Sequence, residues 1–93
     1  MPLNVLIVDD HPLMLAAVAG LMQKIGPAVK VFTAESGRQA LRALPPSLDL
    51  DLALVDIGLP DMTGFDVIAS LKQTWANVNT LHLTSITAAF TLM

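Results

Sequence analysis

Three carboxylates stand directly after short apolar runs of this 93-residue sequence, where the polypeptide would leave a buried strand. Asp9 and Asp10 follow residues 4–8, and Asp56 follows residues 52–55. If the fold brings these side chains together, their like charges repel unless a cation intervenes. Magnesium suits such a group, because it prefers oxygen ligands and binds one or two carboxylates together with water and phosphate oxygens. One carboxylate could then attack a phosphorus centre and form an aspartyl phosphate, which makes phosphoryl transfer the chemistry to test.

Hydroxyl and imidazole groups offer further candidates for this chemistry. Thr84 ends the last apolar run and could donate a hydrogen bond to phosphoryl oxygens, although Ser85 competes for the same role. His11, next to the acidic pair, is a candidate metal ligand or phosphate partner. We interpret it instead as a surface histidine before a proline and leave it outside the predicted site. His82, between two leucines, is interpreted as a packed or edge histidine rather than a catalytic base.

Apolar runs and helical periodicities alternate along the chain and predict how these side chains are positioned. Four short runs indicate strands, and apolar residues between them recur at the three-and-four spacing of amphipathic helices. The expected strands are residues 4–8, 29–32, 52–55 and 81–83, and the expected helices are residues 12–25, 36–44 and 64–75. This βαβαβαβ order predicts a parallel sheet covered by helices on both faces. Because ligands of such sheets bind at the carboxyl ends of the strands, Asp9, Asp10, Asp56 and Thr84 are expected to converge there.

Local signals mark where the helices begin. Pro12 suits the first turn of the first helix, which a Gly-Pro pair then closes. Ser36, with Gln39 three residues later, forms a capping box that opens the second helix. Asp61 is predicted to be a loop acid, and Asp66 a first-turn acid that suits the helix dipole. The side chains predicted to pack, rather than to form a cofactor site, are Met14, Met22, Met62 and Phe65.

The composition narrows the classes of function. Hydrophobic residues make up 54% and charged residues only 14%, which excludes a disordered chain. No apolar stretch approaches the roughly 18 to 20 residues of a membrane-spanning helix. A net charge of −3 supplies no basic field for nucleic acid, and the absence of cysteine excludes disulfides, thiolate zinc sites and cysteine nucleophiles. No secretion signal opens the sequence, so we expect a cytoplasmic location.

The order and spacing of these motifs resemble the receiver domain of two-component response regulators. The resemblance is carried by Asp9-Asp10 after the first strand, by residues 56–64 (Asp-Ile-Gly-Leu-Pro-Asp-Met-Thr-Gly) after the third, and by Thr84 after the fourth. It implies an α/β fold of the flavodoxin-like, CheY-like kind, a doubly wound parallel sheet with strand order 2-1-3-4. Strand five and helices four and five of the family's fold are expected to be missing or incomplete.

The resemblance also implies a role for each matching residue. Asp56 would be the phosphoacceptor. Asp10 would be the main carboxylate ligand of Mg²⁺, with Asp9 assisting and Asp56 and the backbone carbonyl of Gly58 as further ligands. Thr84 would be the switch hydroxyl that moves toward the phosphoryl group.

The sequence departs from the family pattern after its last predicted strand. Receivers carry a lysine after strand five that pairs with the phosphoryl group, and Lys24, Lys30 and Lys72 lie on other elements and cannot replace it. We therefore expect a single receiver domain over residues 1–93 that is C-terminally incomplete and that is phosphorylated or switched poorly. Residues 73–93 carry no charge, so the edge of the fourth strand is expected to self-associate.

Our leading hypothesis is a signalling module that accepts a phosphoryl group from a histidine kinase on Asp56 with Mg²⁺. The opening Asp-Asp-His-Pro resembles the branch whose receivers precede a helix-turn-helix domain, which implies transcription regulation as the output. Such a module is not counted as an enzyme, and this segment is expected to bind neither nucleic acid nor membrane itself. The alternative is a truncated receiver that acts in dimerisation or interaction without phosphotransfer. A third alternative is a phosphatase with an aspartate nucleophile. Such phosphatases usually have a second acid two residues after the nucleophile, and Gly58 at that position argues against this alternative.

Overall fold

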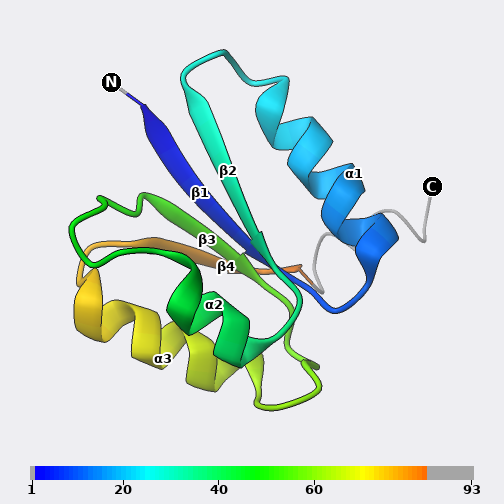
Figure 1. The fold of residues 1–93 in the computed structure, drawn as a ribbon, viewed down its shortest axis with the longest axis vertical. Helices are drawn as coiled ribbons and strands as arrows, with labels where there is room; N and C mark the ends of the chain where they lie inside the picture. Colours follow the sequence, from blue (N-terminus) through cyan, green and yellow to red (C-terminus); the bar gives the residue numbers. More distant parts are fainter. Residues whose placement is uncertain (1, 84–93) are drawn as a thin grey trace.

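The structure, a computed structural model, describes residues 2–83 of the chain (Figure 1). Thr84 and Ser85, the two candidates for the switch hydroxyl, lie outside the described residues, so that assignment stays a prediction. Within residues 2–83 the elements follow one another as β1-α1-β2-α2-β3-α3-β4. The predicted alternation of strands and helices is confirmed.

All strands of the described part of the chain run parallel in one sheet, ordered β2-β1-β3-β4. The strands are β1 (Leu3–Val8), β2 (Val29–Ala34), β3 (Leu52–Val55) and β4 (Asn79–His82). The central strands β1 and β3 are almost wholly buried, because helices cover both faces of the sheet, and this explains their uninterrupted apolar sequences. The predicted CheY-like strand order is confirmed.

The ends of the two outer strands differ from those predicted. β2 continues to Ala34, two residues beyond the apolar run, because its last residues pair with Ile7 and Val8. β4 begins at Asn79 and ends at His82, because each of its four residues pairs with one residue of β3. Pairing with a neighbouring strand, rather than apolar character, therefore sets these boundaries.

The helices begin within one residue of the predicted starts, and one of their capping residues, Thr63, was not predicted. They are α1 (Pro12–Gln23), α2 (Gly37–Ala43) and α3 (Gly64–Thr74). The Ser36 hydroxyl accepts a hydrogen bond from the Gln39 N–H at 3.1 Å, and the Thr63 hydroxyl accepts one from the Asp66 N–H at 3.1 Å. Each bond satisfies a backbone donor that has no partner within the first turn of its helix. α1 ends two residues before the predicted limit at Ile25.

Apolar residues of α1 and α3, and of the segment that follows α1, lie partly in the core and partly at the surface. α1 buries Leu15 and Val18, whereas Ile25 is 65% exposed. α3 buries Val67 and Leu71, and its Phe65 is 58% exposed. Phe65, which was predicted to pack, therefore does not lie in the core.

Phe65 contacts the sheet edge instead. Its ring lies 4.7 Å from the ring of His82 on β4, measured between centroids, at an angle of 59°. This tilted geometry is typical of favourable aromatic pairs. His82 is half-buried beside that ring, which agrees with its prediction as a packed or edge histidine. The three methionines predicted to pack are partly buried against the cores.

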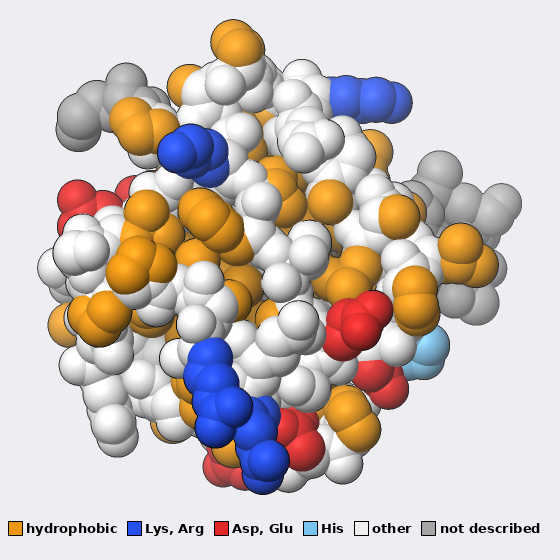
Figure 2. Space-filling model, viewed as in Figure 1, with side chains coloured by type: hydrophobic (Ala, Val, Ile, Leu, Met, Phe, Trp, Pro, Cys, Tyr) orange, Lys and Arg blue, Asp and Glu red, His pale blue; other side chains and the backbone are white. Residues whose placement is uncertain are grey.

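Helices cover the two faces of the sheet unequally (Figure 1). The core between the sheet and the α2–α3 pair includes Leu6, Val8 and Val55 from the central strands. The core on the α1 side is smaller and is built around Ile7 and Leu54. On the face drawn in Figure 2, apolar side chains reach the surface between the helices, and basic side chains at its lower edge lie beside acidic ones.

Candidate metal centre

The sheet brings two of the predicted carboxylates to the same edge. β1 and β3 are parallel neighbours, and Val8 lies opposite Val55 at their carboxyl ends. The backbone bonds continue one residue beyond the strands, since the Asp56 N–H donates to the Val8 carbonyl at 2.9 Å. On the other side of β1, the Asp9 N–H donates to the Ala34 carbonyl at 3.0 Å. Asp9 and Asp56 are therefore fixed by the ladder of the central sheet.

Four side chains meet at this edge. Each of Asp9, Asp10, His11 and Asp56 offers one ligand atom, and these atoms all lie within 4.8 Å of one another. Asp9 is buried, Asp56 is half-buried, and Asp10 and His11 are exposed. Carboxylate oxygens this close, with one of them desolvated, favour a hard divalent cation such as Mg²⁺, so the donor set fits the predicted metal. The predicted convergence of the three aspartates is confirmed.

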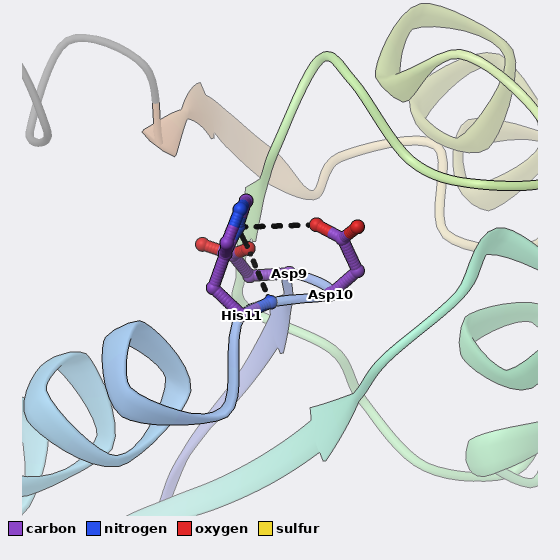
Figure 3. Close-up of polar contacts among 3 residues, drawn as sticks. All are labelled: Asp9, Asp10 and His11. Atoms are coloured by element: carbon purple, nitrogen blue, oxygen red, sulfur yellow. Dashed lines mark hydrogen bonds and ion pairs between the residues drawn. The ribbon is translucent and has the colours of Figure 1, made fainter.

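His11 belongs to this cluster, and the prediction that it lies outside the site is corrected (Figure 3). Its ring Nδ1 lies 2.7 Å from Asp9 Oδ1 and 3.1 Å from Asp10 Oδ1, while its ring remains largely exposed. Its backbone N–H also donates to Asp9 Oδ1, at 2.9 Å. An aspartate side chain that accepts from the N–H two residues later is an Asx turn. The spacing of Asp9 and His11 was the sequence signal for this contact.

The charges of the cluster act on the imidazole. The pKa of His11 is raised above its ordinary value of 6.5, first by the hydrogen bond to Asp9 and then by the negative charge of Asp10. Both effects favour the protonated ring. In the metal-free protein, the protonated form of His11 therefore persists to a higher pH than that of an ordinary histidine, and in that form its charge offsets part of the carboxylates' charge.

The loop after Asp56 is closed by its own backbone. The Gly64 N–H donates to the Ile57 carbonyl at 2.9 Å, and Gly58 lies opposite Thr63 in an antiparallel bridge. Because the bond joins the flanking residues, Gly58 is a non-hydrogen-bonded member of this pair, and its own N–H and carbonyl point away from Thr63. Among residues 2–83 that carbonyl oxygen accepts no hydrogen bond. It is free to bind a cation, and its role as a metal ligand stays a prediction.

Gly64 is required by the tight fit of α3 against this loop. A Cβ atom at Gly64 would lie 2.9 Å from the Ile57 Cα and closer still to the carbonyl oxygen of Asp56. Both neighbours are backbone, so neither can move aside as a flexible side chain would. Only glycine allows α3 to begin directly beside Asp56.

Asp61 has a structural role that the sequence analysis missed. Its two carboxylate oxygens accept hydrogen bonds from the first two backbone N–H groups of α2, those of Gly37 at 2.9 Å and Arg38 at 2.8 Å. These bonds lower the pKa of the Asp61 carboxyl below its ordinary value of 3.8, because they favour the charged form. The partners are more than 20 residues apart, and no local pattern marks their contact.

The lysines within residues 2–83 lie near those ends of their helices and strands that are far from the cluster. Lys24 follows the last residue of α1, and Lys72 is in the last turn of α3. Lys30 pairs with Asn4 near the amino ends of β1 and β2. The prediction that none of the three lies beside Asp56 is therefore consistent with the fold.

Comparisons with known proteins agree with one another. Residues 5–92 match the family model described as the response regulator receiver domain. The chain is 37% identical over 86 residues to the aerobic respiration control sensor protein ArcB of Escherichia coli K12. It is 41% identical over 81 residues to a Pseudomonas aeruginosa PAO1 protein provisionally described as a transcriptional regulator.

A solved structure shows the same fold. A chain in the crystal structure of histidine kinase ThkA in complex with response regulator protein TrrA superposes with a TM-score of 0.74 at 26% identity, over 86% of this chain and 66% of that chain. The matches cover 92% of this chain but 11% of ArcB, and 87% of this chain but 38% of the Pseudomonas protein. Within residues 2–83, no helix combines the length and the apolar character needed to cross a bilayer.

Proposed function

This chain belongs to the response regulator receiver domain family of two-component signalling, and from that premise we propose that it accepts a phosphoryl group on the Asp56 carboxylate. The donor would be the phosphohistidine of a histidine kinase. Support for such a partner comes from the similarity to a chain of the ThkA–TrrA complex, in which a kinase and a response regulator are bound to each other.

The state of the Asp56 carboxylate carries the proposal. Asp9 is buried, and both it and Asp10 have an oxygen engaged by the His11 ring. Asp56 is half-buried, and within residues 2–83 its side chain forms no hydrogen bond. A carboxylate that is accessible and not engaged is the one able to attack an incoming phosphorus atom.

The carboxylates and one backbone carbonyl would hold a magnesium ion beside the attacking oxygen of Asp56. Asp10, Asp9 and Asp56 would bind it, because their ligand oxygens lie within 4.8 Å of one another, and the carbonyl of Gly58, two residues after Asp56, would be a further ligand. When bound, the ion would neutralise charge on the transferring phosphoryl oxygens. Asp9 is held by the backbone hydrogen bonds of the sheet and by His11, so its carboxylate is already positioned within the cluster.

The transfer forms one bond and breaks one. An oxygen of Asp56 attacks phosphorus, the P–N bond to the kinase imidazole breaks, and the bonding electron pair leaves with the imidazole nitrogen, which takes up a proton. The product is an acyl phosphate on Asp56. Water later attacks phosphorus and restores the carboxylate and free phosphate.

The test uses phosphoramidate, a small donor with the same P–N bond. We expect Mg²⁺-dependent addition of one phosphoryl group to the wild-type chain, removed by hydroxylamine, and none in Asp56→Asn. Asp49→Asn, which changes an exposed acid before β3, is the matched control and should behave as wild type. Phosphate addition to Asp56→Asn at the wild-type level, read by intact-protein mass spectrometry, would contradict the proposal.

The output of the proposed signal is transcription regulation through a DNA-binding domain elsewhere in the whole protein. The similarity to the Pseudomonas protein described as a transcriptional regulator supports this, whereas the similarity to ArcB supports a receiver within a sensor protein. We further propose that this segment works as a cytoplasmic, non-enzymatic module and does not itself bind nucleic acid.

Self-association is the second candidate function. Within residues 2–83, β4 is an outermost strand of the sheet, and its Leu81 is 57% exposed. Such an edge can pair with a second copy. Sedimentation velocity should then show concentration-dependent dimers that Leu81→Lys abolishes. Monomers of the wild type at all micromolar concentrations would exclude this candidate.

A further inference from the structure

We infer that Asp61 is a positioning residue for the metal centre: by holding residues 57–63 against the start of α2, it fixes the Gly58 carbonyl where a cation can bind. The inference rests on the proposed function, because it concerns the same metal centre. It assigns to Asp61 a role that its place in an exposed loop does not reveal.

Backbone and capping hydrogen bonds hold the two ends of the loop, and Leu59 and Met62 pack against the core from its middle. The Gly64 N–H bond to Ile57 and the Thr63 cap of α3 fix the two ends. Among residues 2–83, the polar contact that holds the middle of the loop is the Asp61 pair of bonds, at 2.9 Å to Gly37 and 2.8 Å to Arg38. Without that pair, the loop would keep the Gly58–Thr63 bridge and the packing of Leu59 and Met62 against the core, but it would lose its polar contact with α2.

An apolar contact reinforces the same junction. Met62 is partly buried against the α2–α3 core, and its side chain occupies the space that a Cβ atom at Gly37 would need. Asp61 and Met62 therefore both hold the loop to the first residue of α2. The Met62 side chain can lie this close to the backbone of α2 because Gly37 has no side chain.

Asp61 and Ser36 share the capping of α2, which separates capping from loop positioning. Ser36 accepts from the N–H of Gln39, the third residue of the helix, and Asp61 accepts from the first two. Removal of either side chain leaves helix donors unpaired. Only the removal of Asp61 also removes the polar contact between the loop and α2, so Ser36→Ala is a matched control for the loss of helix capping.

The experiment compares Mg²⁺ affinity, by isothermal titration calorimetry, in wild type, Asp61→Ala, Asp61→Asn and Ser36→Ala. Groups that orient a metal ligand typically contribute 10- to 100-fold to metal affinity, so we expect about a tenfold weaker Kd in Asp61→Ala. Ser36→Ala should stay within about twofold of wild type. Asn keeps one acceptor oxygen, so Asp61→Asn should fall between wild type and Asp61→Ala.

A second readout needs no metal. Amide hydrogen exchange in the metal-free protein should be faster for residues 57–62 in Asp61→Ala, and unchanged there in Ser36→Ala. Should Asp61→Ala not fold, Asp61→Asn carries both tests, with a smaller weakening of Kd and a smaller increase in exchange.

Two different results would overturn different claims. Equal Mg²⁺ affinity in wild type, the folded Asp61 variants and Ser36→Ala, with unchanged exchange of residues 57–62, would reduce Asp61 to a helix cap. Failure of the wild-type chain to bind Mg²⁺ or to be phosphorylated on Asp56 would instead defeat the proposed function. Phosphorylation at saturating Mg²⁺ should recover in Asp61→Ala, because its nucleophile is intact.

Discussion

The metal centre has two arms that are positioned by different kinds of contact. The N-terminal arm, residues 9–11, extends the buried strand β1, and its side-chain bonds join residues two positions or fewer apart. The loop arm, residues 56–63, begins at the ladder bond from Asp56 to Val8 but then depends on the starts of α2 and α3. The position of the N-terminal arm therefore depends on the buried strand that it extends. The position of the loop arm should also respond to substitutions at the starts of α2 and α3.

Among the substitutions that test this difference between the two arms, Gly64→Ala is expected to have the largest effect on stability. The new methyl group meets the backbone of Asp56 and Ile57, so α3 and the loop arm must separate, and overpacking of this kind costs about 1 to 3 kcal/mol. We expect that loss in the free energy of unfolding, measured with urea. The N-terminal arm does not touch Gly64, so the contact between His11 and Asp9 should persist.

Gly20→Ala is the matched control for this substitution. A Cβ atom at Gly20, within α1, would meet no atom within 4 Å, and alanine in a helix interior is favoured over glycine by about 0.5 to 1 kcal/mol. The control should therefore be stabilised. Equal stability of the two variants would show that α3 does not pack on the loop arm as described.

A smaller effect is expected from the acid titration of Asp61. Its folded-state pKa is lowered below the ordinary 3.8, so its contribution to stability is complete above that value and is lost as the pH falls through the folded-state pKa. The stability difference between wild type and Asp61→Asn should shrink as the pH falls from about 5 to about 2.5. A difference that stays constant over this range would contradict the lowered pKa.

The sequence correctly predicts the positions of those side chains that depend on the sheet alone. Asp9, Asp10 and Asp56 follow strands whose apolar runs are read directly, and parallel neighbours bring their ends together. The surface position predicted for His11 is confirmed, but its contact with Asp9 was not predicted, because that contact depends on how one exposed ring is turned. The prediction failed at Phe65, where the helical pattern did not distinguish the core from the ring of His82.

Asp61 shows a different limit. Its partners on α2 lie more than 20 residues earlier in the chain, and a loop acid after a proline gives no sign of which backbone N–H groups it will meet. The ends of β2 and β4 were misplaced for a related reason. Their boundaries depend on neighbouring strands rather than on their own residues.

The sequence by itself determined the parallel sheet, the helix start at Ser36, and the meeting of three carboxylates at the carboxyl ends of the strands. Those features follow from local periodicity and from the rule that parallel strands end together. Only the tertiary structure decided which carboxylate stays unengaged and which residues hold the loop arm. Hydrogen bonds between distant segments depend on packing distances of a few ångströms, and no spacing along the chain encodes them.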